Sequence, residues 1–114
     1  MTIITEGNHT AGFILSDADK MSYDQITVAS GQKLEAGTIL GKITASGKYT
    51  AYSNAAADGS GLAAGILYAE CDATLSDKNA VMLARLAEVA VSRLTGYDSA
   101  ADADLRIINI IPRI

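Results

Sequence analysis

Residues 34–61 read LEAGTILGKITASGKYTAYSNAAADGSG, a stretch in which short β-type runs alternate with turns marked by glycine. Thr38–Ile43 and Lys48–Tyr52 are rich in Thr, Ile and Tyr, residues that favour strands. Between them, Ala45–Gly47 is short enough for a hairpin turn whose glycine has a positive φ. The pattern predicts a β-hairpin at the centre of the fold.

Asp58 and Gly59 end this pattern with an Asp-Gly pair, which Ser60 and Gly61 follow. Aspartate in such a pair accepts hydrogen bonds from its own backbone, and glycine adopts the left-handed conformation at little cost. We therefore predict a tight turn or loop here, with a positive φ at Gly59 as at Gly47.

The composition predicts one domain with a thin core. A chain of 114 residues and 11.8 kDa buries about 65% of the surface of its unfolded form. Hydrophobic residues make up 49% of the sequence, but many are alanine, and there is one Phe and no Trp to fill an interior. Cys71 is the only cysteine, which excludes an intramolecular disulfide, and we expect it to be a small buried hydrophobe.

Charge and hydropathy exclude two classes of partner. The formal net charge is −4 and the sequence pI is about 4.7, whereas phosphate binding requires clustered Lys and Arg. No stretch approaches the roughly 18 uninterrupted apolar residues of a membrane span, and the N-terminus lacks a basic region followed by an apolar run. We expect neither nucleic acid nor membrane as a partner, and a protein that is made and folds in a cytosol.

The residues that carry enzyme chemistry are absent or isolated. The only histidine, His9, lies in a polar N-terminal segment that cannot hold a preorganised geometry. His9 and Cys71 are far apart in sequence and show no metal-ligand spacing. Gly37–Lys42 has too few residues for a phosphate-binding loop, and Ile43 stands where Ser or Thr is required. We expect no enzyme, no cofactor and no metal site.

An ordered series of motifs covers most of the chain. L-x-A-G-T-x-L-G-K-x-T-x-S-G-K-Y begins at Leu34, A-x-D-G-S at Ala56 and A-x-G-I-L at Ala63. The rest of the series is Ser22-Tyr23-Asp24 before Ile26-Thr27-Val28, Arg85 before Ala87-Glu88-Val89, and a closing Ile110-Ile111-Pro112-Arg113. The whole series resembles the lambda-type phage head decoration proteins, small trimeric proteins on the outside of a capsid.

The resemblance implies a structural function. A protein of this family binds the outer surface of the phage head as a homotrimer, stabilises the shell and has the major capsid protein as its partner. Its location is the virion, preceded by the host cytoplasm during assembly, and its gene belongs to a phage or a prophage.

Residues 1–12 have too little apolar periodicity to dock as an element, and they predict a flexible N-terminal arm. Residues 13–114 then form a single head-decoration domain. Four β-prone residues of the arm, Thr2, Ile3, Ile4 and Thr5, can pair with a sheet edge on a partner, and the resemblance implies that this partner is the capsid protein. The alternative is an ordinary frayed terminus.

Outward from the hairpin, the pattern predicts a mainly β or α+β fold of small antiparallel sheets. Strand candidates are Phe13–Leu15, Gln25–Ala29 and Ala63–Cys71, an apolar run broken by Glu70 that fits a mostly buried strand. A polar loop is expected over Asp72–Asn79. Ala80–Leu94 fits both helical and alternating spacing, and the resemblance favours two strands joined near Leu86.

One short helix is predicted near the C-terminus. Asp98 or Ser99 can cap a helix whose body is Ala100–Arg106. Asn109–Ile114 follows as an extended strand, and Pro112 restricts it to a sheet edge or to a position where its missing donor costs nothing.

A carrier domain is the alternative function. Gly31-Gln32-x-Leu34-x-Ala36-Gly37-x-x-Leu40 is similar to the strand-turn-strand half of biotinyl and lipoyl carriers, and Ser76-Asp77-Lys78 resembles their lysine-bearing turn. In those carriers the lysine turn precedes the corresponding half, whereas Lys78 follows it. Modification of Lys78 by a prosthetic group would distinguish the two functions.

Overall fold

Ten strands and one α-helix make up most of the described chain, which the computed structural model covers over residues 14–17, 23–85 and 87–113. The predicted arm, residues 1–12, lies outside the described residues. The elements are β1 (Ile14–Asp17), β2 (Tyr23–Val28), β3 (Gln32–Leu34), β4 (Ile39–Lys42), β5 (Tyr49–Ala51), β6 (Ala63–Leu67), β7 (Cys71–Ala73), β8 (Lys78–Leu83), β9 (Ala87–Ala90), the 3₁₀ helix η2 (Val91–Arg93), α1 (Ser99–Ile107) and β10 (Ile110–Arg113).

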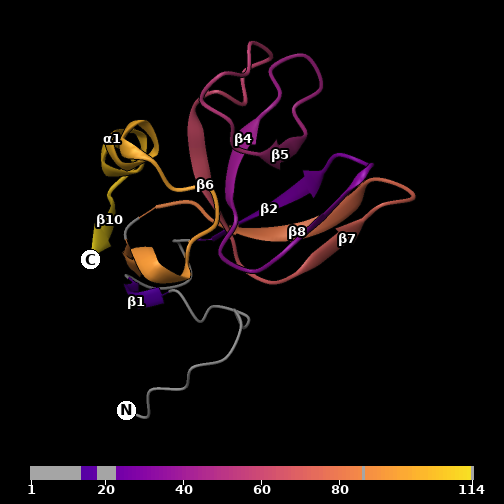
Figure 1. Cartoon of the computed structure of the whole chain (residues 1–114). Coiled ribbons are helices and arrows are strands. Elements are labelled where there is room, and N and C mark those ends of the chain that lie inside the picture. The colour runs from indigo at the N-terminus through magenta and orange to yellow at the C-terminus, as the bar shows by residue number, and fades with distance from the viewer. Residues whose placement is uncertain (1–13, 18–22, 86, 114) are drawn as a thin grey trace.

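A small closed barrel occupies the centre of the molecule, with the strand order β2-β5-β4-β6-β8 (Figure 1). Most neighbours in the barrel are antiparallel. The exception is the junction of β2 and β5, a single parallel pair between Val28 and Tyr49. The amide of Ala29 donates to the carbonyl of Tyr49 at 2.9 Å, which closes the barrel at this point.

The Gln32 side chain reinforces the closure. Its amide nitrogen donates to the carbonyl of Ala29 at 2.9 Å, and its carbonyl oxygen accepts from the Thr50 hydroxyl at 2.9 Å and from the Ala51 amide at 3.4 Å. Gln32 thus bridges β2 and β5 where only one backbone pair joins them.

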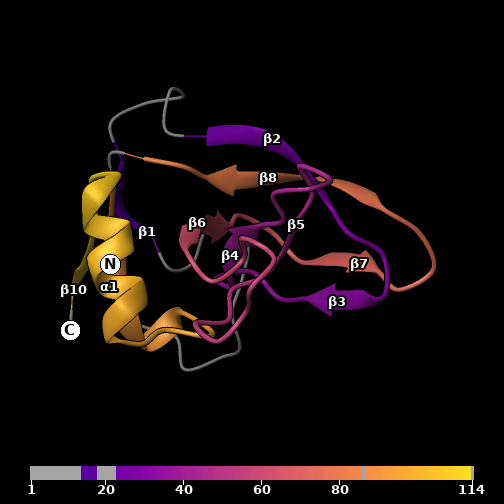
Figure 2. The ribbon, with the colours of Figure 1, turned by 90° about the horizontal axis from the view of Figure 1, so that it is seen from above.

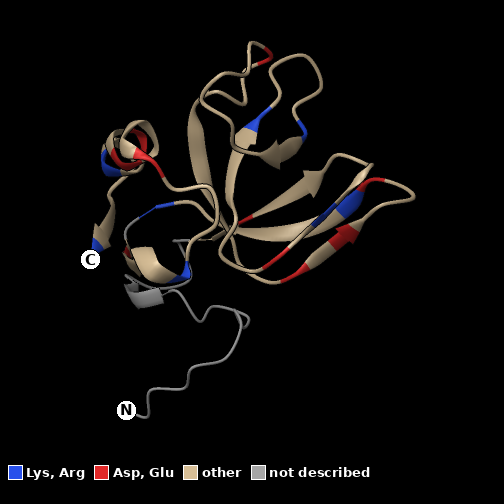
Figure 3. Ribbon diagram, viewed as in Figure 1, with Lys and Arg blue, Asp and Glu red and all other residues tan. Residues whose placement is uncertain are grey.

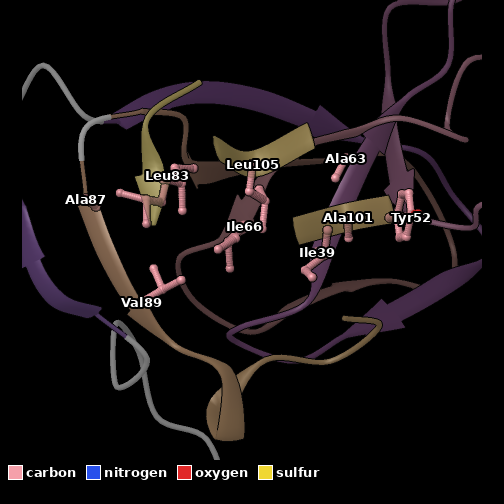
Figure 4. Close-up of a cluster of buried hydrophobic side chains, with 10 residues drawn as sticks. Ile39, Tyr52, Ala63, Ile66, Leu83, Ala87, Val89, Ala101 and Leu105 are labelled. Carbon is pink, nitrogen blue, oxygen red and sulfur yellow. The ribbon is translucent and has the colours of Figure 1, made fainter. Parts of the chain in front are cut away.

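Two hydrophobic clusters lie on opposite sides of β4, β6 and β8. Each strand sends neighbouring residues to different clusters: Ile39 and Leu40, Ile66 and Leu67, Leu83 and Met82. The first cluster packs beneath α1 and β10, where Ile39, Ile66 and Leu105 converge (Figure 4). The second draws on all five barrel strands and on β3 and β7, a two-stranded antiparallel sheet that Figure 2 shows on the side of the molecule away from α1.

A three-stranded sheet, β1-β9-β10, flanks the first cluster. β1 is antiparallel and β10 is parallel to the central strand β9. Because β10 pairs only with β9 among the described residues, Pro112 lies in an edge strand, as the sequence predicts. The turn from α1 into β10 passes through Asn109, which has a φ of 62°.

Two aspartates attach α1 to the barrel. The Asp98 carboxylate caps the helix by accepting from the Ala101 amide at 2.7 Å, and it also accepts from the Tyr52 hydroxyl at 3.0 Å. The Asp104 carboxylate accepts from the Ala63 amide of β6 at 3.0 Å. Burial and the bond to Asp98 raise the pKa of Tyr52 to about 12, so its hydroxyl stays protonated and acts as the donor.

Several sequence predictions are confirmed. The central hairpin is β4–β5, the ambiguous segment from residue 80 forms the two strands β8 and β9, and the capped C-terminal helix is α1. The Asp98 cap is as expected. Cys71 is a free, buried thiol, 6% exposed.

Other predictions are wrong in detail. The run Ala63–Cys71 is not one strand, because β6 ends at Leu67 and β7 begins at Cys71. The loop predicted over Asp72–Asn79 is shorter, since β7 includes Asp72 and β8 begins at Lys78. The sheets are also not purely antiparallel, and the sequence does not predict the closure of one of them into a barrel.

Candidate functional site

The arm residues predicted to bind the capsid, Thr2, Ile3, Ile4 and Thr5, lie outside the described residues. The structure does describe β1, the strand that follows the arm. β1 pairs with β9, with Ile14 opposite Val89 at one end and Asp17 opposite Ala87 at the other. Among the described residues β9 is its only neighbour, so β1 is an edge strand of this sheet. The arm therefore precedes a strand at a sheet edge, not one in the barrel wall.

The turn of the β4–β5 hairpin is formed as its sequence predicts. Gly47 has a φ of 73°, and its amide donates to the carbonyl of Ile43 at 2.8 Å. The Ile43 amide donates to the carbonyl of Lys48 at 2.8 Å and continues the ladder toward the turn. A Cβ at Gly47 would have open space, with only the end of the Lys42 side chain at 4.0 Å. Gly47 is required for its backbone angle and not for close packing.

The Asp58 loop closes on itself through the aspartate. The Asp58 carboxylate accepts from the Ser60 amide at 3.0 Å and from the Ser60 hydroxyl at 2.5 Å. These two hydrogen bonds hold the pKa of Asp58 below its usual value. The carboxylate therefore fixes the geometry of the loop.

The same loop lies directly on the hairpin. The Thr44 amide donates to the Asp58 carbonyl at 2.9 Å. Gly59 has a φ of 108°, and a Cβ there would lie 2.7 Å from the Lys42 carbonyl oxygen and collide with the Thr44 hydroxyl. On the facing strand, a Cβ at Gly41 would lie 2.6 Å from the Ser60 Cα. Backbone packs on backbone here, and only glycine permits this distance.

Gly41 is a structural position that the sequence analysis does not single out. The sequence presents this glycine only as part of a G-x-x-L-G-K pattern that superficially resembles a phosphate loop. The signal that could have found it is the pairing of a mid-strand glycine in β4 with a glycine-rich loop, which indicates close approach of two backbones.

Charges on the described surface are mixed. Figure 3 shows acidic and basic residues side by side on β3, β7 and α1. Lys33 pairs with Glu70 at 3.8 Å, Lys48 with Asp77 at 2.5 Å and Arg106 with Asp102 at 2.5 Å. This surface has no broad basic patch of the kind that nucleic acid requires.

Four large apolar side chains of the described residues are exposed: Val81 at 38%, and more fully Leu62 at 67%, Leu75 at 96% and Ile107 at 78%. The last three come from three different regions, the end of the Asp58 loop, the β7–β8 loop and the last turn of α1. Surface leucines are common in single domains, and apolar side chains exposed singly, as these are, do not by themselves mark a binding patch.

Within the described ranges, no group of three His, Cys, Asp or Glu residues is placed to hold a metal ion. Nor is any helix there long and apolar enough to cross a bilayer. Lys78, the candidate modification site of a carrier domain, is exposed as the first residue of β8, in register with Val28 of β2.

The described structure is a β-rich domain with a single short helix, and the motif series covers most of the chain. Comparison with protein families matches residues 3–109 to the family described as bacteriophage lambda head decoration protein D. The chain belongs to this family, which places it in the capsid of a virion. A search of curated proteins found no match.

We expect valine at position 59 to destabilise the fold more than valine at position 47. Both substitutions impose a left-handed conformation on a β-branched residue, which costs about 1–2 kcal/mol. Gly59→Val alone would also bring a side chain into collision with the hairpin backbone, which adds about 1–3 kcal/mol. Urea unfolding of Gly47→Val and Gly59→Val measures both losses.

The matched control is Gly47→Asn, because asparagine tolerates the left-handed region and open space surrounds this position. Its midpoint should lie close to that of the original protein. Equal midpoints for Gly59→Val and the original protein would contradict the close approach of loop and hairpin.

Proposed function

We propose that the protein attaches to the outer surface of a phage head as a homotrimer, with the major capsid protein as its binding partner, and stabilises the shell. The family match over residues 3–109 carries this proposal, because it includes the β-prone arm as well as the folded domain. The role is structural and not enzymatic. The protein would be made in the host cytoplasm, from a phage or a prophage, before it joins the virion.

The thin core supports association with other chains. The largest fully buried side chains are Ile, Leu and Val, and the apolar residues Leu62, Leu75 and Ile107 remain in solvent. If a shell or another copy covered them, the complex would be stabilised by about 25 cal/mol for each Å² of apolar surface removed from water. The carrier alternative has no comparable support, since the family match concerns a head protein and Lys78 lies in strand register with Val28.

The proposed attachment is addition of Thr2–Thr5 as a strand on the capsid protein. Each new backbone hydrogen bond contributes about 0.5–1.5 kcal/mol net, while ordering each residue costs about 1–2 kcal/mol. Burial of Ile3 and Ile4 adds about 1.5–3 kcal/mol each. One arm is therefore marginal, and three arms on a trimer give durable attachment through effective concentration.

We expect density for the bound protein to show three copies around each local threefold axis of the head. Imaging of expanded empty heads mixed with the purified protein tests this arrangement. Isolated single copies away from any local threefold axis would exclude the trimer.

We also expect deletion of residues 1–10 to abolish binding to heads while the melting curve stays nearly unchanged, because the deleted residues precede the described domain. Sedimentation of heads with bound protein measures occupancy, and circular dichroism measures melting.

Two matched variants separate the apolar contribution from that of the backbone. Replacing Ile3 and Ile4 together by Val keeps both apolar area and β propensity and should preserve binding. Replacing both by Asn should weaken it strongly. Full binding by the truncated protein would exclude the arm, and loss of folding would show that the arm belongs to the core.

A further inference from the structure

A groove of about 850 Å³ opens between the β4–β5 hairpin and the antiparallel ribbon of β2 and β8. The hairpin contributes Lys42, Gly47 and Tyr49 to its walls. In Figure 1 the hairpin rises above this ribbon, and β7 lies on the ribbon's other side. The groove is therefore on the face of the ribbon that does not pack on the second hydrophobic cluster.

The floor of the groove is mostly polar, although Val81 is an exposed apolar residue in it. Gln25 and Thr27 of β2 face Val81 and Asn79 of β8 in register, and the Thr27 hydroxyl donates to the Asn79 side chain at 3.4 Å. Alternation along β2 sends Ile26 into the second cluster instead. The groove is thus suited to a polar or mixed occupant and not to an apolar one.

The backbone of β2 has an open edge at this groove. The Ala29 amide points at Tyr49 of β5, so alternation along the strand turns the amides of Gln25 and Thr27 to the same side, away from β8. The carbonyl of Val81, opposite Gln25, accepts from Tyr68, which confirms that the pair of Gln25 and Val81 is not hydrogen-bonded across the ribbon.

Among the described residues, β5 covers this edge only beside Val28, where the Ala29 amide donates to the Tyr49 carbonyl. Nearer the start of β2, no part of β5 lies beside Gln25, because the chain turns at Gly47 and leads back to β4. Among the described residues, the strand pairings give Gln25 no partner on its outer side. An unpaired strand edge is a template for another extended chain.

The charges at the groove favour one kind of chain. Asp24 is already neutralised by Arg85, with 2.7 Å between its carboxylate and the guanidinium. Lys42 has no ion-pair partner among the described residues. The remaining charge therefore favours an acidic side chain on the occupant.

We propose that the open edge of β2 at Gln25 and Thr27 binds an extended segment of the major capsid protein, which adds as a strand and directs an acidic side chain at Lys42. This inference rests on the proposed function and adds a second contact to it, on the folded domain instead of the arm. The capsid protein is the occupant because membership of the family places the chain on a capsid.

The test exploits the outward direction of the Gln25 amide. Gln25→Pro removes a donor that β8 does not use, so the ladder of the ribbon survives. It should reduce the apparent affinity for empty heads about tenfold or more, the equivalent of losing one or two backbone hydrogen bonds. Gln25→Ala keeps the backbone amide and should lose less affinity than Gln25→Pro.

Hydrogen exchange on the original protein gives a second measurement, which does not depend on the folding of a variant. The amides of Gln25 and Thr27 should exchange fast in the free protein and at least about tenfold more slowly on heads. If the original protein does not bind heads, the proposed function fails, and the same two amides are then measured with overlapping synthetic peptides of the capsid protein.

Each remaining outcome decides the proposal. Slowed exchange with heads or with a peptide, together with weakened binding on Lys42→Glu, supports it. Unchanged exchange with both overturns it. Slow exchange in the free protein that depends on its concentration also overturns it, because a second copy then covers the edge. Equal losses for Gln25→Ala and Gln25→Pro would overturn it too, because a ligand then contacts the side chain and not the backbone.

Discussion

The structure depends on a barrel wall that is buried on both faces. β4, β6 and β8 carry consecutive large apolar residues, such as Ile66 and Leu67, which alternate between two hydrophobic clusters. With one Phe and no Trp, the chain cannot fill one thick interior, so two thin clusters share a wall. Helix α1 covers one cluster and the two-stranded sheet of β3 and β7 covers the other. Neither cover could be removed without exposing part of the same wall.

This construction leaves the turns and edges available for contacts. The Asp58 loop packs on the hairpin through backbone alone, at Gly59 and Gly41, so it adds a rigid surface without adding apolar volume. The barrel closes through a single backbone pair at Val28, with the side chain of Gln32 beside it. So narrow a closure leaves an open strand edge at Gln25, and a virion protein has partners that can use such an edge.

The sequence predicts local elements better than it predicts how they join. Asp98 before an alanine-rich segment, and Gly47 between two β-type runs, are local signals, and both features are present. The barrel closure depends on one long-range pair and on a glutamine side chain, for which no sequence pattern exists. The run from Ala63 to Cys71 is apolar except for Glu70, because its residues face two clusters and then turn a corner, so hydropathy alone cannot show where β6 ends. The role of the arm residues, from Thr2 to Thr5, stays a prediction.

Residue-resolved hydrogen exchange on a Leu67→Ala variant tests the shared wall most directly. Leu67 is completely buried in the second cluster, and its truncation should cost about 2–5 kcal/mol. If the two clusters form one cooperative unit, the amide of Leu105 in α1, which packs on the first cluster, should lose the same free energy of protection as the amides of β3 and β7. Loss of protection confined to β3 and β7, with Leu105 unchanged, would contradict a fold built on one shared wall.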